Sequence, residues 1–188
     1  MKLAFIGGGV MGEAIISALL ANGIVQPADI VVCDIAARRR QHLERTYGVK
    51  AMDSSAAAIK GSDIVVLAVK PQEFPSAAEA ISGRLKPDQT VLSILAGIST
   101  AAIGDSLGHE AVVRAIPNTP AQIGEGMTVW TATEAVSRRR RQSVRKVLGA
   151  LGQELHVEDE KYIDMATALS ASGPAFVFLV MEALIDAA

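Results

Sequence analysis

Three glycines near the start of the chain have the spacing of a turn that holds a dinucleotide. Gly7, Gly9 and Gly12 form a G-x-G-x-x-G pattern. The pattern follows a predicted strand, Lys2–Ile6, and opens a predicted helix, Val10–Ala21. The first glycine permits a tight turn, the second lets the backbone approach a pyrophosphate, and the third lets helix and strand pack closely. The pyrophosphate would lie at the positive end of the helix dipole, facing unpaired N–H groups.

An acidic residue lies at the distance that such a site requires. Asp34 ends a second predicted strand, Ile30–Asp34, and comes 22 residues after Gly12, close to the expected spacing of about 20. A carboxylate here accepts a hydrogen bond from a free 2′-hydroxyl and repels a 2′-phosphate, which favours NADH. Arg38–Arg40 follow directly and favour NADPH. The sequence therefore predicts NAD(H) or NADP(H) without choosing between them.

The elements that must position these residues alternate along the chain. Ile64–Val69 and Val91–Leu95 are apolar nearly throughout, as in strands that are covered on both faces of a parallel sheet. This alternation predicts an α/β fold with a doubly wound, Rossmann-type, mostly parallel sheet. The expected strands are Lys2–Ile6, Ile30–Asp34, Asp63–Val69, Thr90–Leu95, Ala111–Ile116, Met127–Thr131 and Glu154–Val157. The expected helices between them are Val10–Ala21, Ala36–Tyr47, Ser54–Lys60, Pro75–Leu85, Thr100–Leu107 and Glu134–Leu151.

The character of the sequence changes near residue 160. No strand pattern follows, and two helices are expected, Glu160–Ala171 and Pro174–Ala188, separated by Ser172-Gly173-Pro174. The second helix is apolar nearly all round, so it requires cover on several sides. We therefore expect a dinucleotide-binding domain over 1–159 and the start of a helical dimerisation and substrate domain over 160–188. The cover would come from a second copy, so the chain should be dimeric or larger.

Composition limits the classes of partner that we expect this chain to bind. The formal net charge is −2, so nothing in the overall charge calls for a nucleic acid or an anionic membrane. Arg138–Arg141 lack interleaved aromatic residues, which favours a solvated helix face over a phosphate-rich partner. The single cysteine, Cys33, fits a reducing compartment, and we expect a cytoplasmic protein. His42, His109 and His156 lie far apart in sequence, so no metal site is expected.

Five segments together resemble the Δ1-pyrroline-5-carboxylate reductase family of proline biosynthesis. They span nearly the whole chain in the family's order, and the last two are the most specific. The segments are Ile6-Gly7-Gly8-Gly9-Val10-Met11-Gly12-Glu13-Ala14, Ala68-Val69-Lys70-Pro71-Gln72, Leu92-Ser93-Ile94-Leu95-Ala96-Gly97, Ile116-Pro117-Asn118-Thr119-Pro120-Ala121 and Thr167-Ala168-Leu169-Ser170-Ala171-Ser172-Gly173-Pro174-Ala175-Phe176.

The resemblance implies a role for each matching residue. Thr167 would hydrogen-bond the ring nitrogen of a bound cyclic imine, although a threonine there can also bond to its own helix backbone. The pyrophosphate would be held by Ile6, Gly7, Gly8, Gly9, Val10, Met11 and Gly12. The adenosine side would be met by Asp34 and Ser55. The rest of the cofactor would be lined by Ala68, Val69, Lys70, Pro71, Ala96 and Gly97, with Asn118 and Thr119 at the nicotinamide end.

The resemblance also implies the reaction, which is the NAD(P)H-dependent reduction of 1-pyrroline-5-carboxylate to L-proline. Such chemistry asks for alignment of two rings more than for reactive side chains. The family's later helices carry a Ser-Pro-Gly-Gly-Thr loop that holds the substrate carboxylate, and these 188 residues do not include it, so we expect the chain alone to be poorly active. Ala171 also replaces a glycine common in the family. The alternatives are a β-hydroxyacid-dehydrogenase-like oxidoreductase and a non-catalytic nucleotide-binding module that senses redox state.

Overall fold

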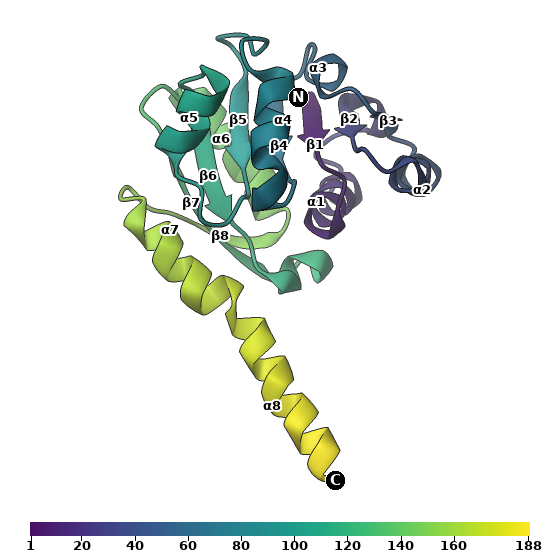
Figure 1. Cartoon of the computed structure of the whole chain (residues 1–188), viewed down its shortest axis with the longest axis vertical. Helices are drawn as coiled ribbons and strands as arrows, with labels where there is room; N and C mark the ends of the chain where they lie inside the picture. The colour runs from purple at the N-terminus through teal and green to yellow at the C-terminus, as the bar shows by residue number, and fades with distance from the viewer.

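The computed structural model describes all 188 residues and has one eight-stranded sheet with helices on both faces (Figure 1). The strand order is β3-β2-β1-β4-β5-β6-β7-β8. The first six strands are parallel, β7 is antiparallel to β6, and β8 is parallel to β7. The strands are β1 (Leu3–Ile6), β2 (Ile30–Cys33), β3 (Lys50–Met52), β4 (Ile64–Leu67), β5 (Thr90–Ser93), β6 (Val112–Ile116), β7 (Gly126–Ala132) and β8 (Gly152–His156). The expected doubly wound, mostly parallel fold is confirmed.

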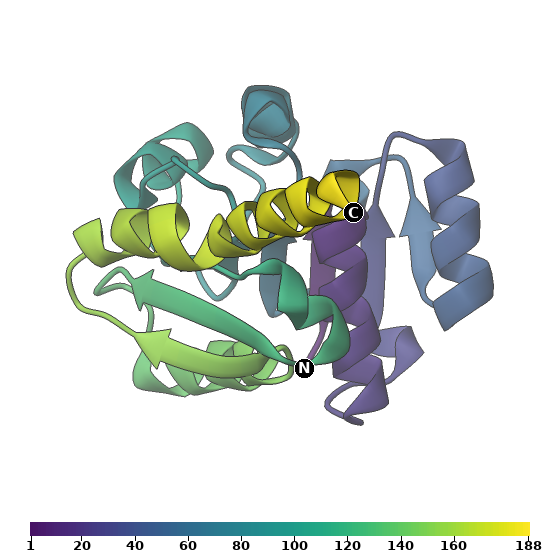
Figure 2. The same cartoon turned by 90° about the horizontal axis from the view of Figure 1, so that it is seen from below.

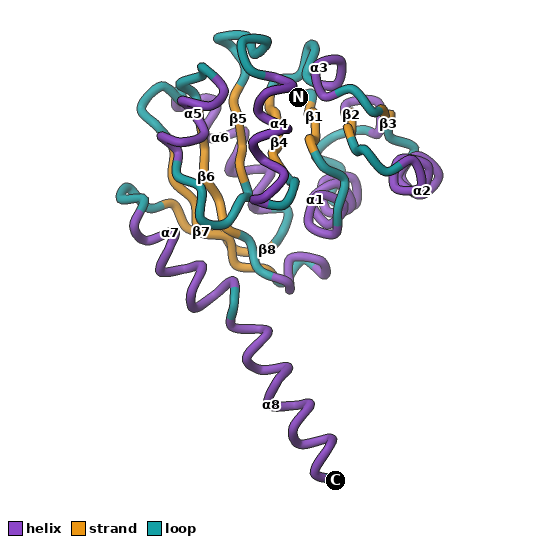
Figure 3. The backbone as a smooth tube through the Cα atoms, in the orientation of Figure 1, coloured by secondary structure: helices purple, strands orange, loops and turns teal.

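Six of the eight α-helices connect strands, and α7 and α8 follow the last strand (Figure 3). The α-helices are α1 (Val10–Ala21), α2 (Ala37–Tyr47), α3 (Ser55–Ala58), α4 (Phe74–Ile81), α5 (Thr100–Leu107), α6 (Arg138–Gly149), α7 (Lys161–Ala166) and α8 (Gly173–Ala187). The 3-10 turns are η1 (Pro27–Asp29), η2 (Pro71–Glu73) and η3 (Thr119–Ile123), and a π-helical turn, η4 (Thr167–Ala171), joins α7 to α8.

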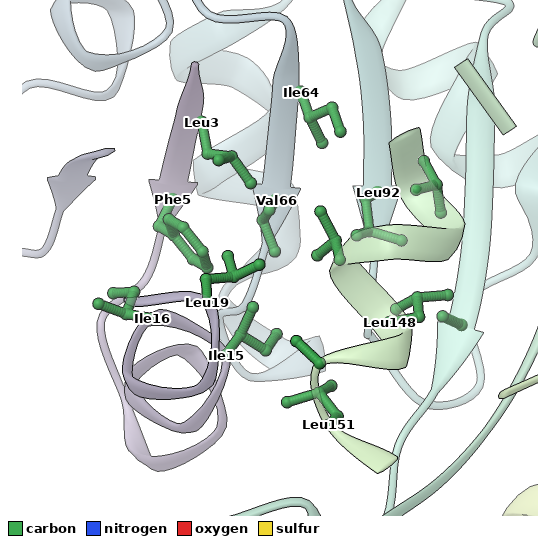
Figure 4. Close-up of a cluster of buried hydrophobic side chains, with 14 of the residues drawn as sticks. Leu3, Phe5, Ile15, Ile16, Leu19, Ile64, Val66, Leu92, Leu148 and Leu151 are labelled. Atoms are coloured by element: carbon green, nitrogen blue, oxygen red, sulfur yellow. The ribbon is translucent and has the colours of Figure 1, made fainter. Parts of the chain in front are cut away.

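The core lies in two layers because side chains alternate along each strand. In β1, Leu3 and Phe5 join the cluster under α1, α2 and α6, whereas Ala4 and Ile6 join the cluster under α3, α4 and α5. Figure 4 shows the first of these layers, in which side chains of α1 and α6 meet those of β1, β4 and β5. Both faces of the central strands are therefore buried, as their continuous apolar runs predict.

Several expected boundaries were wrong for local reasons. The short strand β3 was missed, since its three residues have no apolar run of their own and are held by pairing with β2. The helix expected from Glu134 begins instead at Arg138, because the Ser137 hydroxyl accepts a hydrogen bond from the Arg140 N–H and caps it there. Before α4, Pro71–Glu73 form a 3-10 turn, and α4 itself ends at Ile81.

The expected separation at Ser172-Gly173-Pro174 is reduced to one turn residue, Ser172. Ser172 has right-handed helical angles, so the chain passes from the π turn into α8, which begins at Gly173, without an extended loop. Both the backbone N–H and the hydroxyl of Ser172 donate to the carbonyl of Thr167, five residues earlier. This wider turn accommodates Pro174, which has no N–H to continue an α-helical ladder.

The two halves of this helical segment have different surroundings. In α7, Ile163 is fully buried against Ile116 of β6 and Val129 of β7. No residue of α8 is buried, and in Figure 1 it extends away from the sheet with the C-terminus at its tip; Figure 2 shows the same helix from below, in front of the sheet. The helical segment thus packs on the sheet through α7 and the π turn, and no residue of α8 is buried.

Candidate active site

Several of the residues expected to form the site follow the carboxyl ends of parallel strands. Gly7 follows β1, Asp34 follows β2, Ala68 follows β4, and Asn118 follows β6. These ends share one edge of the sheet, and β1 lies between β2 and β4, where the chain order reverses. In open α/β sheets this reversal point is where ligands bind.

The glycine turn has the geometry of a cradle that is closed on one side and open on the other. Gly7 has φ +97°, and a Cβ there would come within 2.6 Å of the Ala68 carbonyl oxygen. A Cβ on Gly12 would come within 2.8 Å of the Gly7 carbonyl oxygen, whereas one on Gly9 would meet no atom within 4 Å. Gly9 is the N-cap of α1, and no side chain caps it. The first turn of α1 is therefore uncapped and open beside Gly9, and such helix N-termini favour anions.

Asp34 is bound to this cradle. One carboxylate oxygen accepts from the Gly8 N–H at 2.9 Å and the other accepts from the Ala36 N–H at 2.9 Å. Ser55 lies on the same side, where its hydroxyl is 3.3 Å from the Cys33 sulfur. Burial raises the pKa of the Cys33 thiol, and neighbouring Asp34 adds to this. Cys33 is thus a protonated core residue.

The arginines after Asp34 divide into two groups. Arg39 donates to the Gly8 carbonyl and forms an ion pair with Glu13 on α1. Arg40 donates to the carbonyls of Asp34 and Ile35, at 2.8 and 3.0 Å. Only Arg38 makes no hydrogen bond or ion pair.

Glu13 joins α1 to α2, a role that its place in the sequence does not reveal. It accepts hydrogen bonds from His42, Arg39 and Tyr47. Burial alone would raise its pKa, but these three partners outweigh burial and leave the pKa lowered. The signal in the sequence was an acid one residue beyond the glycine pattern, in the first turn of α1.

At the other end of the site, Asn118 connects three elements. Its side-chain oxygen accepts from the Met127 N–H at the start of β7, at 2.9 Å. Its amide nitrogen lies 3.5 Å from the hydroxyl of Ser170 in the π turn. A shallow groove of about 300 Å³ lies alongside, between η3 and the start of α8; its lining residues are Thr119, Pro120, Gln122, Ile123, Pro174 and Phe178.

The remaining expected residues line the same edge. Ala68, Val69 and Lys70 follow β4, and the Lys70 N–H donates to the Glu73 carboxylate across the turn that Pro71 begins. Ala96 and Gly97 are exposed after β5, and Gly97 has φ +73°. The Thr167 hydroxyl donates to the carbonyl of Ile163 in its own helix at 2.8 Å. No group of three or more potential metal ligands is present.

The basic run on α6 is not wholly a solvated face. Arg140 donates to the carbonyls of Pro87 and Asp88, and Arg141 donates to those of Ala132, Thr133 and Val136. Arg138 and Arg139 are exposed as expected. Half of the run therefore joins α6 to loops, a role that charge alone did not reveal.

A Rossmann-type sheet with a glycine cradle and an acid after β2 defines a nicotinamide-dependent oxidoreductase. Residues 2–97 match the family model described as NADP oxidoreductase coenzyme F420-dependent, and residues 160–188 match that of pyrroline-5-carboxylate reductase dimerisation. The pyrroline-5-carboxylate reductase of Pseudomonas aeruginosa is 39% identical over 187 residues, covering 99% of this chain and 68% of that protein. The chain belongs to the pyrroline-5-carboxylate reductase family, an enzyme family of proline biosynthesis.

Solved structures of pyrroline-5-carboxylate reductases have the same fold as this chain. The structure of a pyrroline-5-carboxylate reductase from Coxiella burnetii has a TM-score of 0.88 and 33% identity, covering 99% of this chain and 69% of that chain. The Plasmodium falciparum pyrroline carboxylate reductase, solved with NADP bound, has a TM-score of 0.88 and 29% identity, covering all of this chain and 68% of that chain. The chain thus spans about two thirds of its relatives.

The apolar surface of α7 and α8 allows two interpretations, contact with a membrane or contact with another protein chain. The continuous helical segment Lys161–Ala187 is long and apolar enough to cross a membrane. Residues 160–188 match the dimerisation model of the family, which favours contact with another protein chain over a membrane span.

Proposed function

We propose that the carboxyl edge of the sheet binds the nicotinamide cofactor and that the protein reduces 1-pyrroline-5-carboxylate to L-proline there. The observation that carries this proposal is the convergence, on one edge, of the open glycine cradle, Asp34, Asn118 and the helix bearing Thr167. When bound, the cofactor supplies the hydride for the imine carbon. The chain's own residues hold the cofactor, align the imine and exclude water from it.

Thr167 has the polarity that a protonated imine requires. A threonine hydroxyl has one proton to donate and two lone pairs that accept. Here the proton is given to the Ile163 carbonyl at 2.8 Å, so the oxygen offers its lone pairs. An iminium N–H⁺ is a donor, and its positive charge makes the ring carbon electrophilic. Back-bonding to the helix therefore prepares Thr167 for substrate contact instead of competing with it.

A matched pair of variants tests Thr167. Thr167→Val keeps the shape but removes the acceptor, and we expect hydride transfer to slow about 10- to 100-fold. Thr167→Ser keeps the hydroxyl and should stay within a few-fold of the parent. Single-turnover oxidation of NADH with protein in excess detects even slow transfer. Equal rates in the valine and serine variants would remove Thr167 from the site.

We propose further that NADH is preferred over NADPH. Asp34 presents a carboxylate at the adenosine side, while Arg39 and Arg40 are bound to Glu13 and to backbone carbonyls. Arg38 alone is left to meet a 2′-phosphate. Asp34→Ser should shift the NADH-to-NADPH affinity ratio toward NADPH by about 1–2 kcal/mol, the scale of one charged hydrogen bond. Fluorescence titration with both cofactors measures this, with Asp105→Ser on α5 as a remote control.

The assembly and compartment complete the proposal. The protein forms a dimer or larger homo-oligomer through α7 and α8, in the cytoplasm, where Cys33 stays reduced. The nucleotide-binding part comprises residues 1–159, and the helical part begins at residue 160. The first experiment is turnover of NADH with pyrroline-5-carboxylate, with L-proline identified by mass. Cofactor binding without any L-proline, even in single turnover, would favour a nucleotide-sensing module.

A further inference from the structure

One buried cation lies behind the candidate site and touches none of the residues assigned to it. Arg114 is on β6, and its side chain is only 2% exposed. Its side chain points to the face of the sheet that α5 covers, because Val112, two residues earlier on the same strand, belongs to the cluster on that face. A fully buried arginine is rare unless it is paired, so its partners indicate what it does.

Both partners of Arg114 come from the helical segment. One terminal nitrogen donates to a Glu160 carboxylate oxygen at 2.9 Å, and the other donates to Asp164 on α7 at 2.6 Å. These are charge-assisted hydrogen bonds from a planar group, which fix direction as well as distance. The two carboxylates are separated by one turn of helix, so Arg114 holds the start of the segment at two points.

Glu160 extends the junction to a third element. Its two carboxylate oxygens accept from the backbone N–H and the hydroxyl of Thr100, at 2.8 and 2.9 Å. Thr100 is the first residue of α5, where a carboxylate is favoured by the helix dipole. Ala96 and Gly97 lie in the loop just before this helix. Through Glu160, the guanidinium on β6 is therefore connected to the first residue of α5 as well as to α7.

Each of the three connected elements adjoins part of the candidate site. The loop with Gly97 leads into α5, β6 leads to Asn118, and α7 leads to Thr167. Ile163 lies between the two ends of this connection: it is fully buried in the sheet, and its carbonyl accepts the Thr167 hydroxyl proton. A rotation of α7 would move that carbonyl and the hydroxyl together.

We propose that Arg114 is a positioning residue for hydride transfer, which acts through Glu160 and Asp164 to hold the Thr167-bearing helix against the nicotinamide end of the site. This inference rests on the proposed function. Arg114 itself contacts neither cofactor nor substrate. It sets the distance between two parts of the site, and errors of about 1 Å in such distances can slow a reaction about 100-fold.

Arg114→Met, which keeps a long apolar stem, is the principal test. We expect amide hydrogen exchange over residues 160–172 to rise at least about tenfold as α7 loosens. Single-turnover hydride transfer should slow about 10- to 100-fold, while the NADH dissociation constant changes less than about twofold. Arg114→Lys should restore part of the rate, because an ammonium can reach one carboxylate but cannot bridge two.

A second arginine supplies the matched control. Arg141 also joins elements through several hydrogen bonds, but it does so near Thr133, which pairs with Val112 at the start of β6, the end of the strand away from Asn118. Arg141→Met should change neither exchange over 160–172 nor the hydride-transfer rate. A general loss of stability would instead affect both variants alike, and thermal melts report it. Equal losses in Arg141→Met and Arg114→Met would overturn the proposal.

Milder variants keep the proposal testable if Arg114→Met does not fold. Asp164→Asn changes a partner whose side chain is 66% exposed, and Glu160→Gln keeps the shape of the other. Both should show the same pattern with smaller amplitude. Unchanged exchange over 160–172 in these variants, or faster exchange with an unchanged hydride-transfer rate, overturns the inference. If the parent protein transfers no hydride to pyrroline-5-carboxylate, the proposed function fails, and the exchange measurement still decides whether Arg114 holds α7.

Discussion

Helices α1 and α8 are both predominantly apolar, yet their surroundings are opposite. Five residues of α1 are buried, against strands of the same chain, while α8 buries none. Phe176 and Phe178 are each 58% exposed on α8. An apolar pattern all round a helix thus predicts that it will be covered but not by what. For α1 the cover is internal, and for α8 the dimerisation match points to another chain.

The largest expected effect is on assembly. Replacing both Phe176 and Phe178 by Ser removes about 3–6 kcal/mol of potential burial. The oligomer's dissociation constant should rise about 10²- to 10⁴-fold, while NADH affinity stays unchanged. Sedimentation velocity over a concentration series measures the shift, with Glu182→Gln on the same helix as control. If the parent protein sediments as a monomer at micromolar concentration, the inference that another chain covers α8 is wrong.

Two shortened chains locate the edge of the folding unit. Removing residues 173–188 should change the unfolding free energy by less than about 1 kcal/mol, because α8 contacts little of the sheet. Removing 160–188 should cost about 2–5 kcal/mol, since Ile163 burial and the Arg114 ion pairs are lost. Urea unfolding separates the two. Equal stability of both shortened chains would show that residues 160–172 do not stabilise the nucleotide-binding part.

Within the nucleotide-binding part, two glycines separate stability from binding. Gly12→Ala places a Cβ 2.8 Å from the Gly7 carbonyl oxygen, and should destabilise by about 1–3 kcal/mol. Gly9→Val should leave stability nearly unchanged, because φ −65° and ψ −170° suit any residue and the space is open. It should instead abolish NADH binding. Unaltered NADH affinity in Gly9→Val would show that the cradle is not the pyrophosphate site.

The smallest expected effect is on how the unfolding free energy depends on pH. Glu13 has a lowered pKa, so its partners stabilise the fold above the ordinary value of 4.5 and lose that effect as pH falls through the lowered pKa. Glu13→Gln should therefore cost about 1 kcal/mol at pH 7, and the difference should shrink below pH 4.5. Urea unfolding of both proteins at pH 7, 5 and 3.5 checks this. A constant difference across that range would exclude the carboxylate as its source.

The sheet was predictable because its signal is local. The runs around Val66 and Leu92 require burial on both faces, and the glycine pattern requires a strand before it and a helix after it. Strand β3 was not predictable, since Lys50–Met52 are extended only by pairing with β2. The π turn was missed because its defining bond, from Ser172 to the Thr167 carbonyl, looks like ordinary helix capping in sequence.

The site was predictable where a residue acts through its type and not where it acts through a partner. Gly9 and Asp34 follow from spacing alone. Glu13 and Arg114 are ordinary charged residues in sequence, and their importance comes from partners 26 to 50 residues away. Arg39 shows the converse: next to Asp34 it looks available to a phosphate, yet Glu13 already binds it.

The π turn also sets the angular phase of α8. Each residue of an α-helix advances about 100° around the axis, so one residue more or less in Thr167–Ala171 rotates everything beyond it by that angle. A deletion that converted this turn to regular α-helix would leave α8 equally apolar. It would nevertheless turn Phe176 and Phe178 toward a different direction relative to the sheet. The number of residues in Thr167–Ala171 therefore determines which way Phe176 and Phe178, on the proposed oligomer surface, face relative to the candidate site.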